Sequence, residues 1–131
     1  MSKSEKYEIG VATRREVMGE ALMERMANTV YSGPVMQKFA EVSTETVFGN
    51  LWSRPGLDYK TRSLICVISD TCSHCWPELE LHLRFALGQG WTEDELTEAL
   101  LHLGGYIGVP SVREGLIIAE RVFEEERAAK R

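Results

Sequence analysis

Apolar residues recur along the chain at helical spacing, between short segments rich in glycine and proline. One predicted helix covers residues 13–27 and a second covers residues 34–48. In each, apolar side chains three or four positions apart fall on one face. No alternation of apolar and polar residues reaches the length of a strand. The pattern therefore predicts an all-α fold with about six helices.

The starts of the later helices carry capping signals. Asp58 fits the N-cap of a third helix, which ends near a pair of cysteines, and Pro77 suits the first turn of a fourth. Residues 92–95 read Thr-Glu-Asp-Glu, a capping-box pattern, and residues 111–114 repeat the signal. These positions predict where the last four helices begin.

The third predicted helix has apolar residues on every side. Residues 64–68 read Leu-Ile-Cys-Val-Ile, with no polar face. Such a helix is predicted to be buried within the domain or between subunits. A small all-α domain of this kind often completes its core by forming an oligomer.

Length and charge narrow the class of protein. The 131 residues suit one domain over residues 1–131, and the net charge of −5 argues against a nucleic-acid partner. The first ten residues lack the apolar core of a signal peptide, and no apolar run has membrane-spanning length. We therefore expect a cytoplasmic protein without a membrane partner, whose three cysteines are thiols.

Two of the cysteines are candidates for a redox or metal site. Cys72 and Cys75 are three positions apart, so in a helix they would share a face and could act as a dithiol reductant. The strand that precedes such a motif in thioredoxin is missing. A zinc site would need two more ligands, and the three histidines, 74, 82 and 102, lack zinc-finger spacing. Two inert thiols are the third reading. We predict no metal.

A histidine and two arginines form the other candidate group. His82 lies among leucines, so it is expected to be partly buried, either as a core residue or as a catalyst. Arg54 and Arg62 flank a Pro-Gly turn, and Trp52 precedes it. Guanidinium groups bind carboxylates in a bidentate manner, and an aromatic wall excludes water. Alternatively, Arg62 forms a structural ion pair and Trp52 belongs to the core.

Several motifs resemble the carboxymuconolactone decarboxylase family. They are Trp52-Ser-Arg-Pro-Gly-Leu57, Thr61-Arg-Ser-Leu64, His82-Leu-Arg-Phe-Ala-Leu87, Gly90-Trp-Thr-Glu-Asp-Glu-Leu96 and Tyr106-Ile-Gly-Val-Pro110. The resemblance extends over nearly the whole chain. It implies an all-α, alkylhydroperoxidase-D-like domain that forms a ring-like homo-oligomer, a trimer or hexamer.

The resemblance also implies an activity. It is the decarboxylation of 4-carboxymuconolactone, or of a closely related lactone acid, in aromatic-acid breakdown, with no metal or organic cofactor. His82 would be the general acid/base and Arg54 would hold a carboxylate of this small-molecule substrate. Trp52, Arg62 and Tyr106 would bind the rest of the substrate.

The same superfamily includes thiol peroxidases, which supply an alternative. Their motif has a histidine four positions after the second cysteine and a glutamate upstream. Here Leu79 and Ser63 occupy those positions, and His82 comes seven residues after Cys75. A thiol-dependent peroxidase or disulfide reductase using Cys72 and Cys75 is therefore the alternative function, and a tautomerase or binding protein on the same fold is another.

Overall fold

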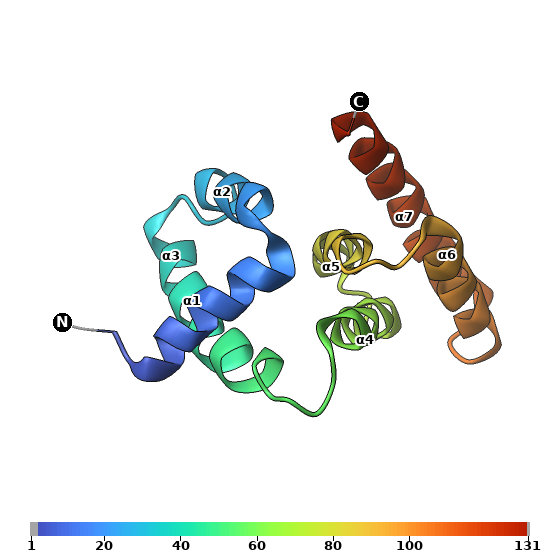
Figure 1. Ribbon diagram of the computed structural model, residues 1–131. Coiled ribbons are helices and arrows are strands. Elements are labelled where there is room, and N and C mark those ends of the chain that lie inside the picture. Colours follow the sequence, from blue (N-terminus) through green and yellow to red (C-terminus); the bar gives the residue numbers. More distant parts are fainter. Residues whose placement is uncertain (1–2, 131) are drawn as a thin grey trace. The chain divides into compact units, whose positions relative to one another are not determined.

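The computed structural model describes residues 3–130, and every regular element in that part of the chain is a helix (Figure 1). It forms seven α-helices, a π-helix and a short 3-10 turn, so the all-α prediction is confirmed. None of these helices is both long enough and apolar enough to cross a bilayer. The chain divides into two compact units, with the boundary between Tyr59 and Lys60. A single domain over residues 1–131 stays a prediction.

The first unit contains four helices in sequence. They are α1 (Glu5–Met18), α2 (Glu20–Asn28), α3 (Pro34–Ser43) and the π-helix η1 (Thr44–Trp52). Helix α1 packs along η1, and α3 leads into η1 without a turn. Phe48 and Trp52 of η1 are buried and contribute to the core of this unit.

The prediction of one helix over residues 13–27 was wrong. Gly19 has a φ of 81°, in the left-handed region, and separates α1 from α2. Helix α1 also begins earlier than predicted, because the Ser4 side chain caps it by accepting a hydrogen bond from the Tyr7 N–H at 3.0 Å. Apolar spacing continues across the glycine, which is why periodicity alone did not show the break.

The predicted helix over residues 34–48 changes character part-way. It is α-helical to Ser43 and then widens into η1. Two glycines let η1 approach α1 backbone to backbone. A Cβ atom on Gly10 would lie 2.0 Å from the Thr44 carbonyl oxygen, and one on Gly49 would lie 2.1 Å from the Lys6 carbonyl oxygen.

We expect Gly49→Ala to lower the free energy of unfolding by about 3 kcal/mol, the upper end for an overpacked contact, because the added methyl group meets backbone atoms that cannot move aside. Urea denaturation measures this loss. Gly88→Ala is the matched control, since a Cβ atom there meets nothing within 4 Å. Equal stability of the two variants would contradict the close approach of α1 and η1.

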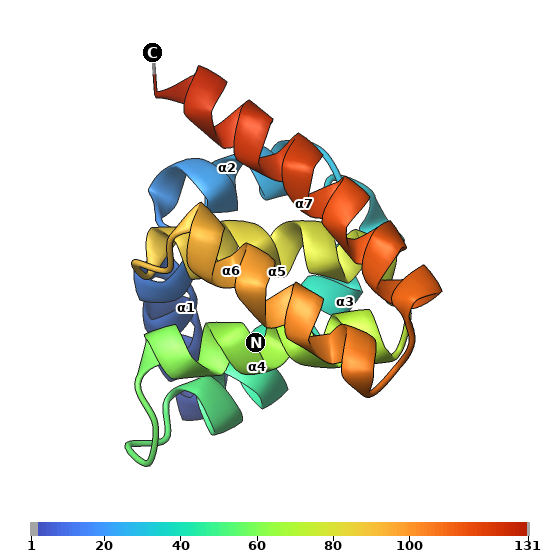
Figure 2. The same ribbon diagram turned by 90° about the vertical axis from the view of Figure 1, so that its right-hand side faces the viewer.

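The second unit is built from four α-helices and a short turn. They are α4 (Tyr59–Cys72), α5 (Trp76–Gly88), α6 (Glu93–His102), the 3-10 turn η2 (Leu103–Gly105) and α7 (Val109–Ala129). Helix α7 packs against both α5 and α6, and Figure 2 shows it running alongside α6. The core consists of buried apolar residues from α4 to α7: Val67, Leu79, Leu83, Ala86, Leu96, Leu100, Ala119, Val122 and Phe123.

Most of the predicted helix starts in this unit are confirmed. The Thr92 hydroxyl accepts a hydrogen bond from the Glu95 N–H and the Glu95 carboxylate accepts one from the Thr92 N–H, each at 3.0 Å, so the capping box is present. The start predicted at Ser111 was wrong. Helix α7 begins at Val109, directly after Gly108, whose φ of 96° turns the chain, and Ser111 lies inside the first helical turn.

The structure confirms burial within the unit for one face of α4, and burial of the rest of the helix between subunits stays a prediction. Val67 is fully buried in the core, whereas Ile65 is half-exposed and Cys66 is partly buried. Helix α4 therefore has one face in the core of its unit and one apolar face outside it.

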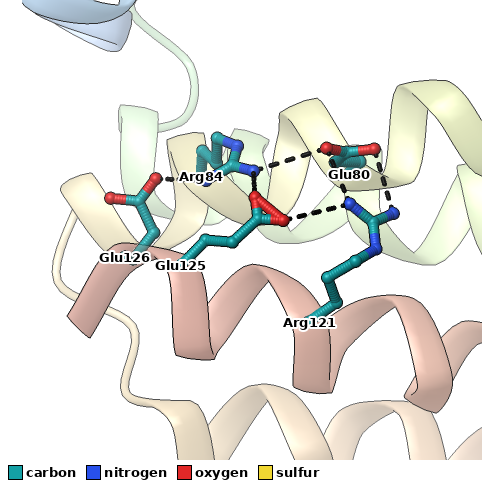
Figure 3. Close-up of polar contacts among 5 residues, drawn as sticks. All are labelled: Glu80, Arg84, Arg121, Glu125 and Glu126. Atoms are coloured by element: carbon teal, nitrogen blue, oxygen red, sulfur yellow. Dashed lines mark hydrogen bonds and ion pairs between the residues drawn. The ribbon is translucent and has the colours of Figure 1, made fainter. Parts of the chain in front are cut away.

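A network of charged side chains joins α5 to α7 (Figure 3). Arg84 has a side chain only 5% exposed and pairs with Glu126, with Glu125 at 3.1 Å and with Glu80 at 3.4 Å. Arg121 pairs with Glu80 and Glu125 from the exposed side. Arg84 belongs to the family-like motif at residues 82–87, and its contacts show a structural role for it.

Candidate active site

A hydrogen-bonded histidine–aspartate pair lies between α4 and α5. The Nδ1 atom of His82 is 2.5 Å from the Oδ2 atom of Asp70. Both side chains are mostly buried, with 17% and 11% exposed. The carboxylate accepts a hydrogen bond, so Nδ1 carries the proton and Nε2 is left to exchange protons with another group. The partial burial predicted for His82 is confirmed.

A tight turn between the two helices positions this pair. His74, in the turn, has a φ of 58° and is the only non-glycine residue of the described chain in the left-handed region. Its ring stacks on Trp76 at 5.1 Å, and its Nε2 atom is 2.8 Å from the Ser111 hydroxyl. The Cys75 N–H donates to the Asp70 carbonyl at 2.8 Å. These contacts fix the turn and so the distance between α4 and α5.

The outer edge of the His82 ring faces a second carboxylate. Its Nε2 atom lies 3.9 Å from the Oε2 atom of Glu78, which is half-exposed. Phe85 presents its ring edge-on to the imidazole at 5.1 Å. The imidazole thus has a buried acid on one nitrogen, an apolar neighbour, and a solvent-exposed acid beside the nitrogen that can transfer a proton. This arrangement suits general acid–base chemistry.

The sequence pattern indicates His82 but not its two acidic neighbours, Asp70 and Glu78. One signal was available for the buried one, because Asp70 is the only acidic residue between positions 59 and 77. A lone acid in an apolar helix needs a partner when it is buried. Nothing in the sequence marked Glu78 apart from its position one helical turn before His82.

The three cysteines lie near the His82–Asp70 pair in the chain but differ in their exposure to solvent. Burial raises the pKa of the Cys66 thiol to about 11, and the negative charges of Asp70 and Glu78 add to the effect, so this thiol stays protonated. Cys72 and Cys75 are exposed and free.

The prediction that Cys72 and Cys75 share a helix face is wrong, because the two residues do not lie in one helix. Cys72 ends α4 and Cys75 precedes α5, on opposite sides of the turn. The Ser73 hydroxyl lies 3.4 Å from the Cys75 sulfur. Within residues 3–130, neither of these thiols hydrogen-bonds to His82, and no group of three metal-ligating side chains is present.

The remaining predicted residues are divided between the units. In the first unit, Trp52 is buried and stacks on Phe48 at 5.8 Å, and Arg54 follows it in an exposed turn. In the second unit, Arg62 lies in the first turns of α4 and is half-buried. Tyr106, after η2, is 77% exposed. Their roles in binding a substrate stay predictions.

Comparison with known proteins decides the family. The model of the carboxymuconolactone decarboxylase family matches residues 37–121. The chain belongs to this family. The match to the carboxymuconolactone decarboxylase family begins in α3 and ends in α7, so it includes both members of the His82–Asp70 pair.

Named relatives agree with this placement. The chain is 34% identical over 125 residues to the 4-carboxymuconolactone decarboxylase of Acinetobacter baylyi, covering 95% of this chain and 92% of that protein. It is 34% identical over 119 residues to the nitrosuccinic acid decarboxylase npaB of Metarhizium robertsii, covering 91% and 82%. Over 84 residues, 63% of each chain, it is 34% identical to an uncharacterized 15.0 kDa protein of Paracoccus denitrificans. Both of the named enzymes are decarboxylases, and the chain is a carboxy-lyase of their family.

Proposed function

We propose that this family member is a cofactor-free decarboxylase of 4-carboxymuconolactone, or of a closely related lactone acid, in aromatic-acid breakdown. We further propose that it works in the cytoplasm as a homo-oligomer, a trimer or hexamer. The observation that carries the catalytic part is the His82–Asp70 pair at 2.5 Å. The identity to a 4-carboxymuconolactone decarboxylase over 95% of the chain supports the substrate class.

The substrate itself supplies the electron sink. Its departing carboxylate is attached to a carbon next to an alkene that is conjugated with the lactone carbonyl. When the carbon–carbon bond to this carboxylate breaks, carbon dioxide leaves and the bonding electrons spread through the alkene onto the carbonyl oxygen. The product of this step is an extended enolate. The enzyme has to bind the substrate, stabilise the growing negative charge and supply one proton.

His82 is placed to supply that proton. Its Nε2–H would protonate the carbon next to the lactone carbonyl, which gives the enol-lactone. Asp70 accepts the hydrogen bond from Nδ1–H throughout, so the ring keeps its orientation while its charge changes. Glu78, on the solvent side of Nε2, would return a proton from water to the ring. One proton enters and one carbon dioxide leaves in each turnover.

The arginines and aromatic residues would bind the substrate. Arg54 would hold the side-chain carboxylate in a bidentate pair, and Arg62 is the second anion-binding residue. Trp52 and Tyr106 would give the lactone ring apolar surroundings, in which a departing carboxylate loses its hydration and leaves more readily as a neutral gas.

Exposed apolar side chains of the second unit support the homo-oligomer. Leu101, Val109, Ile117 and Tyr106, from α6 to α7, are all about half-exposed or more. Apolar side chains that cluster on a surface are typical of subunit contacts. A contact of this kind would cover Tyr106 and allow it to face a substrate.

Incubation of the purified protein with 4-carboxymuconolactone tests the proposal. We expect release of carbon dioxide and formation of the enol-lactone without any added cofactor. An isomerised lactone with no carbon dioxide would favour the tautomerase reading, and binding without any product would favour a binding protein. Either result would overturn the proposed decarboxylation of this lactone.

Nitrosuccinic acid is a second candidate substrate, favoured by the relative that is named for it. It carries a carboxyl group on the carbon that bears the nitro group, so loss of carbon dioxide again leaves a delocalised carbanion that needs one proton. The same assay with nitrosuccinic acid separates the two. The preferred substrate is the one with the higher kcat/KM.

Asp70→Asn tests the role of Asp70 as a positioning residue. We expect kcat to fall about 10- to 100-fold with little change in KM, because the amide no longer fixes the Nδ1–H tautomer of His82. Nitrogen NMR of the imidazole should show an increase of the Nε2–H tautomer. An unchanged kcat together with an unchanged tautomer would contradict this role, whereas a purely structural role would lower the melting temperature and leave the tautomer as it is.

The decarboxylase proposal and the alternative of thiol-dependent chemistry make opposite predictions for a variant that lacks Cys72 and Cys75. On the decarboxylase proposal, the double variant Cys72→Ser/Cys75→Ser keeps full turnover of the lactone, because both thiols are exposed and neither is hydrogen-bonded to His82 in the described structure. Steady-state kinetics with and without a thiol reductant measure this. A large loss of turnover in the double variant would contradict a decarboxylase that works without thiols and would favour thiol chemistry.

A further inference from the structure

The first unit contains a polar pocket whose lining includes none of the residues that we assign to decarboxylation. It has a volume of about 320 Å³ and is lined by residues of α1, α2 and α3 and of the segments beside them. This volume is at the lower end of the range for small-molecule sites, about 300–1,000 Å³. Its charged and polar lining includes Arg14, Tyr7, Tyr31, Gln37 and Glu41.

Arg14 is the cation of this pocket and is partly desolvated. Its guanidinium carbon lies 5.6 Å from the centre of the Tyr31 ring, a cation–π distance. Burial lowers the pKa of Arg14 from its ordinary value, and a guanidinium group nevertheless stays charged at neutral pH. The pocket therefore holds a permanent positive charge that has lost part of its hydration.

No acidic side chain of residues 3–130 neutralises that charge. The one carboxylate in the lining, Glu41, pairs with the Lys3 amine at 2.7 Å. The remaining ion pairs of the described chain involve other cations. A buried or half-buried charge without a counter-charge is costly, so an anion entering the pocket would relieve that cost.

The rest of the lining suits a small, flat acid. The Gln37 amide nitrogen donates to the Ser32 carbonyl at 2.9 Å, which holds the side chain in place. The Tyr31 ring gives an aromatic wall beside the guanidinium group, and Tyr7 adds a second aromatic residue to the lining. A guanidinium fork and aromatic walls together recognise a planar carboxylate better than a spherical anion.

We propose that this pocket is a binding site for small aromatic or unsaturated carboxylates, with Arg14 pairing with the carboxylate group. The site lies within the first unit, whereas His82 and Asp70 belong to the second. The proposal goes beyond decarboxylation and does not depend on it.

Calorimetric titration of the full-length protein tests the site, with benzoate as the probe. Benzamide, which has nearly the same shape but no charge, is the matched ligand. We expect benzoate to bind at least about tenfold more tightly than benzamide, and Arg14→Gln to weaken benzoate binding by at least about tenfold. Arg14→Lys should bind with intermediate affinity, because it keeps the charge and loses the fork.

Two controls make the result specific to this pocket. Arg25→Gln removes one positive charge from an exposed position of α2 in the same unit, and it should leave benzoate binding unchanged. Arg54→Gln reports binding at the proposed substrate site. The proposal is overturned if Arg14→Gln, still folded by circular dichroism, binds benzoate like the wild type, if benzamide binds equally well, or if only Arg54→Gln loses binding. Each of these outcomes leaves the decarboxylase proposal untouched.

Discussion

His82→Ala is expected to lower kcat for decarboxylation by about 100-fold or more, while the protein stays folded. The loss follows from the geometry of the site, since no other imidazole of the described chain has a buried carboxylate within hydrogen-bond distance. A positioned general acid or base contributes about 10²- to 10⁴-fold to a rate. Steady-state kinetics on 4-carboxymuconolactone measure the effect.

His102→Ala is the matched control for this variant. His102 is an exposed histidine at the end of α6, outside the proposed catalytic group, so its replacement should leave kcat within a factor of about two of the wild type. If His82→Ala retained wild-type turnover, the assignment of the proton donor would be wrong. Circular dichroism separates a loss of chemistry from a loss of folding.

Arg84→Ala is expected to cause a large loss of stability, about 2–4 kcal/mol in the free energy of unfolding. Its side chain fills a buried position between α5 and α7, and it neutralises three carboxylates of Glu80, Glu125 and Glu126 (Figure 3). Removing it leaves these like charges together and opens a cavity. The carboxylates are partly exposed, so solvent screens part of the repulsion and keeps the loss below that of a fully buried pair.

This loss should depend on pH in a defined direction. A hydrogen bond from Arg121 holds the pKa of Glu80 below its ordinary value, and one from Arg84 does the same for Glu125. An acid with a lowered pKa stabilises the fold above its unfolded pKa, and that contribution disappears as the pH falls through the folded pKa. The difference between wild type and Arg84→Ala should therefore be full at pH 7 and shrink below about pH 4.

Urea denaturation at pH 7 and in acid gives both quantities. Arg84→Met is a second variant, since it keeps much of the volume and removes only the charge; its loss should be smaller than that of Arg84→Ala. A loss that stayed constant from pH 7 into acid would contradict an electrostatic role for the network.

The helical class of the fold followed from periodicity, whereas two of its boundaries did not. Apolar residues continue at helical spacing across Gly19, and only the backbone conformation shows that the helix stops there. The change from α3 to η1 occurs where α1 approaches closely, a contact that a local pattern does not contain. At Ser111 a capping pattern was present, but Gly108 had already turned the chain and started the helix.

The site could be predicted only as far as single residues. His82 stood out by its type and by the motif around it. Its pairing with Asp70, twelve positions away, depends on the turn at His74, whose positive φ is not encoded by a glycine. The exposed cysteines carried the stronger local signal for a catalytic site. In the structure, however, Cys72 and Cys75 lie on opposite sides of the turn at His74.

Decarboxylation of 4-carboxymuconolactone in D2O, by the wild type and by His82→Ala, tests most directly whether His82 is the proton donor of a decarboxylase. NMR follows the release of carbon dioxide and the position of deuterium in the product. We expect the wild type to release one carbon dioxide for each enol-lactone formed, with deuterium on the carbon next to the lactone carbonyl, and the variant to do so about 100-fold more slowly. Absence of carbon dioxide with the wild type would contradict decarboxylation of this lactone, and equal rates for the two proteins would contradict the role of His82 as proton donor.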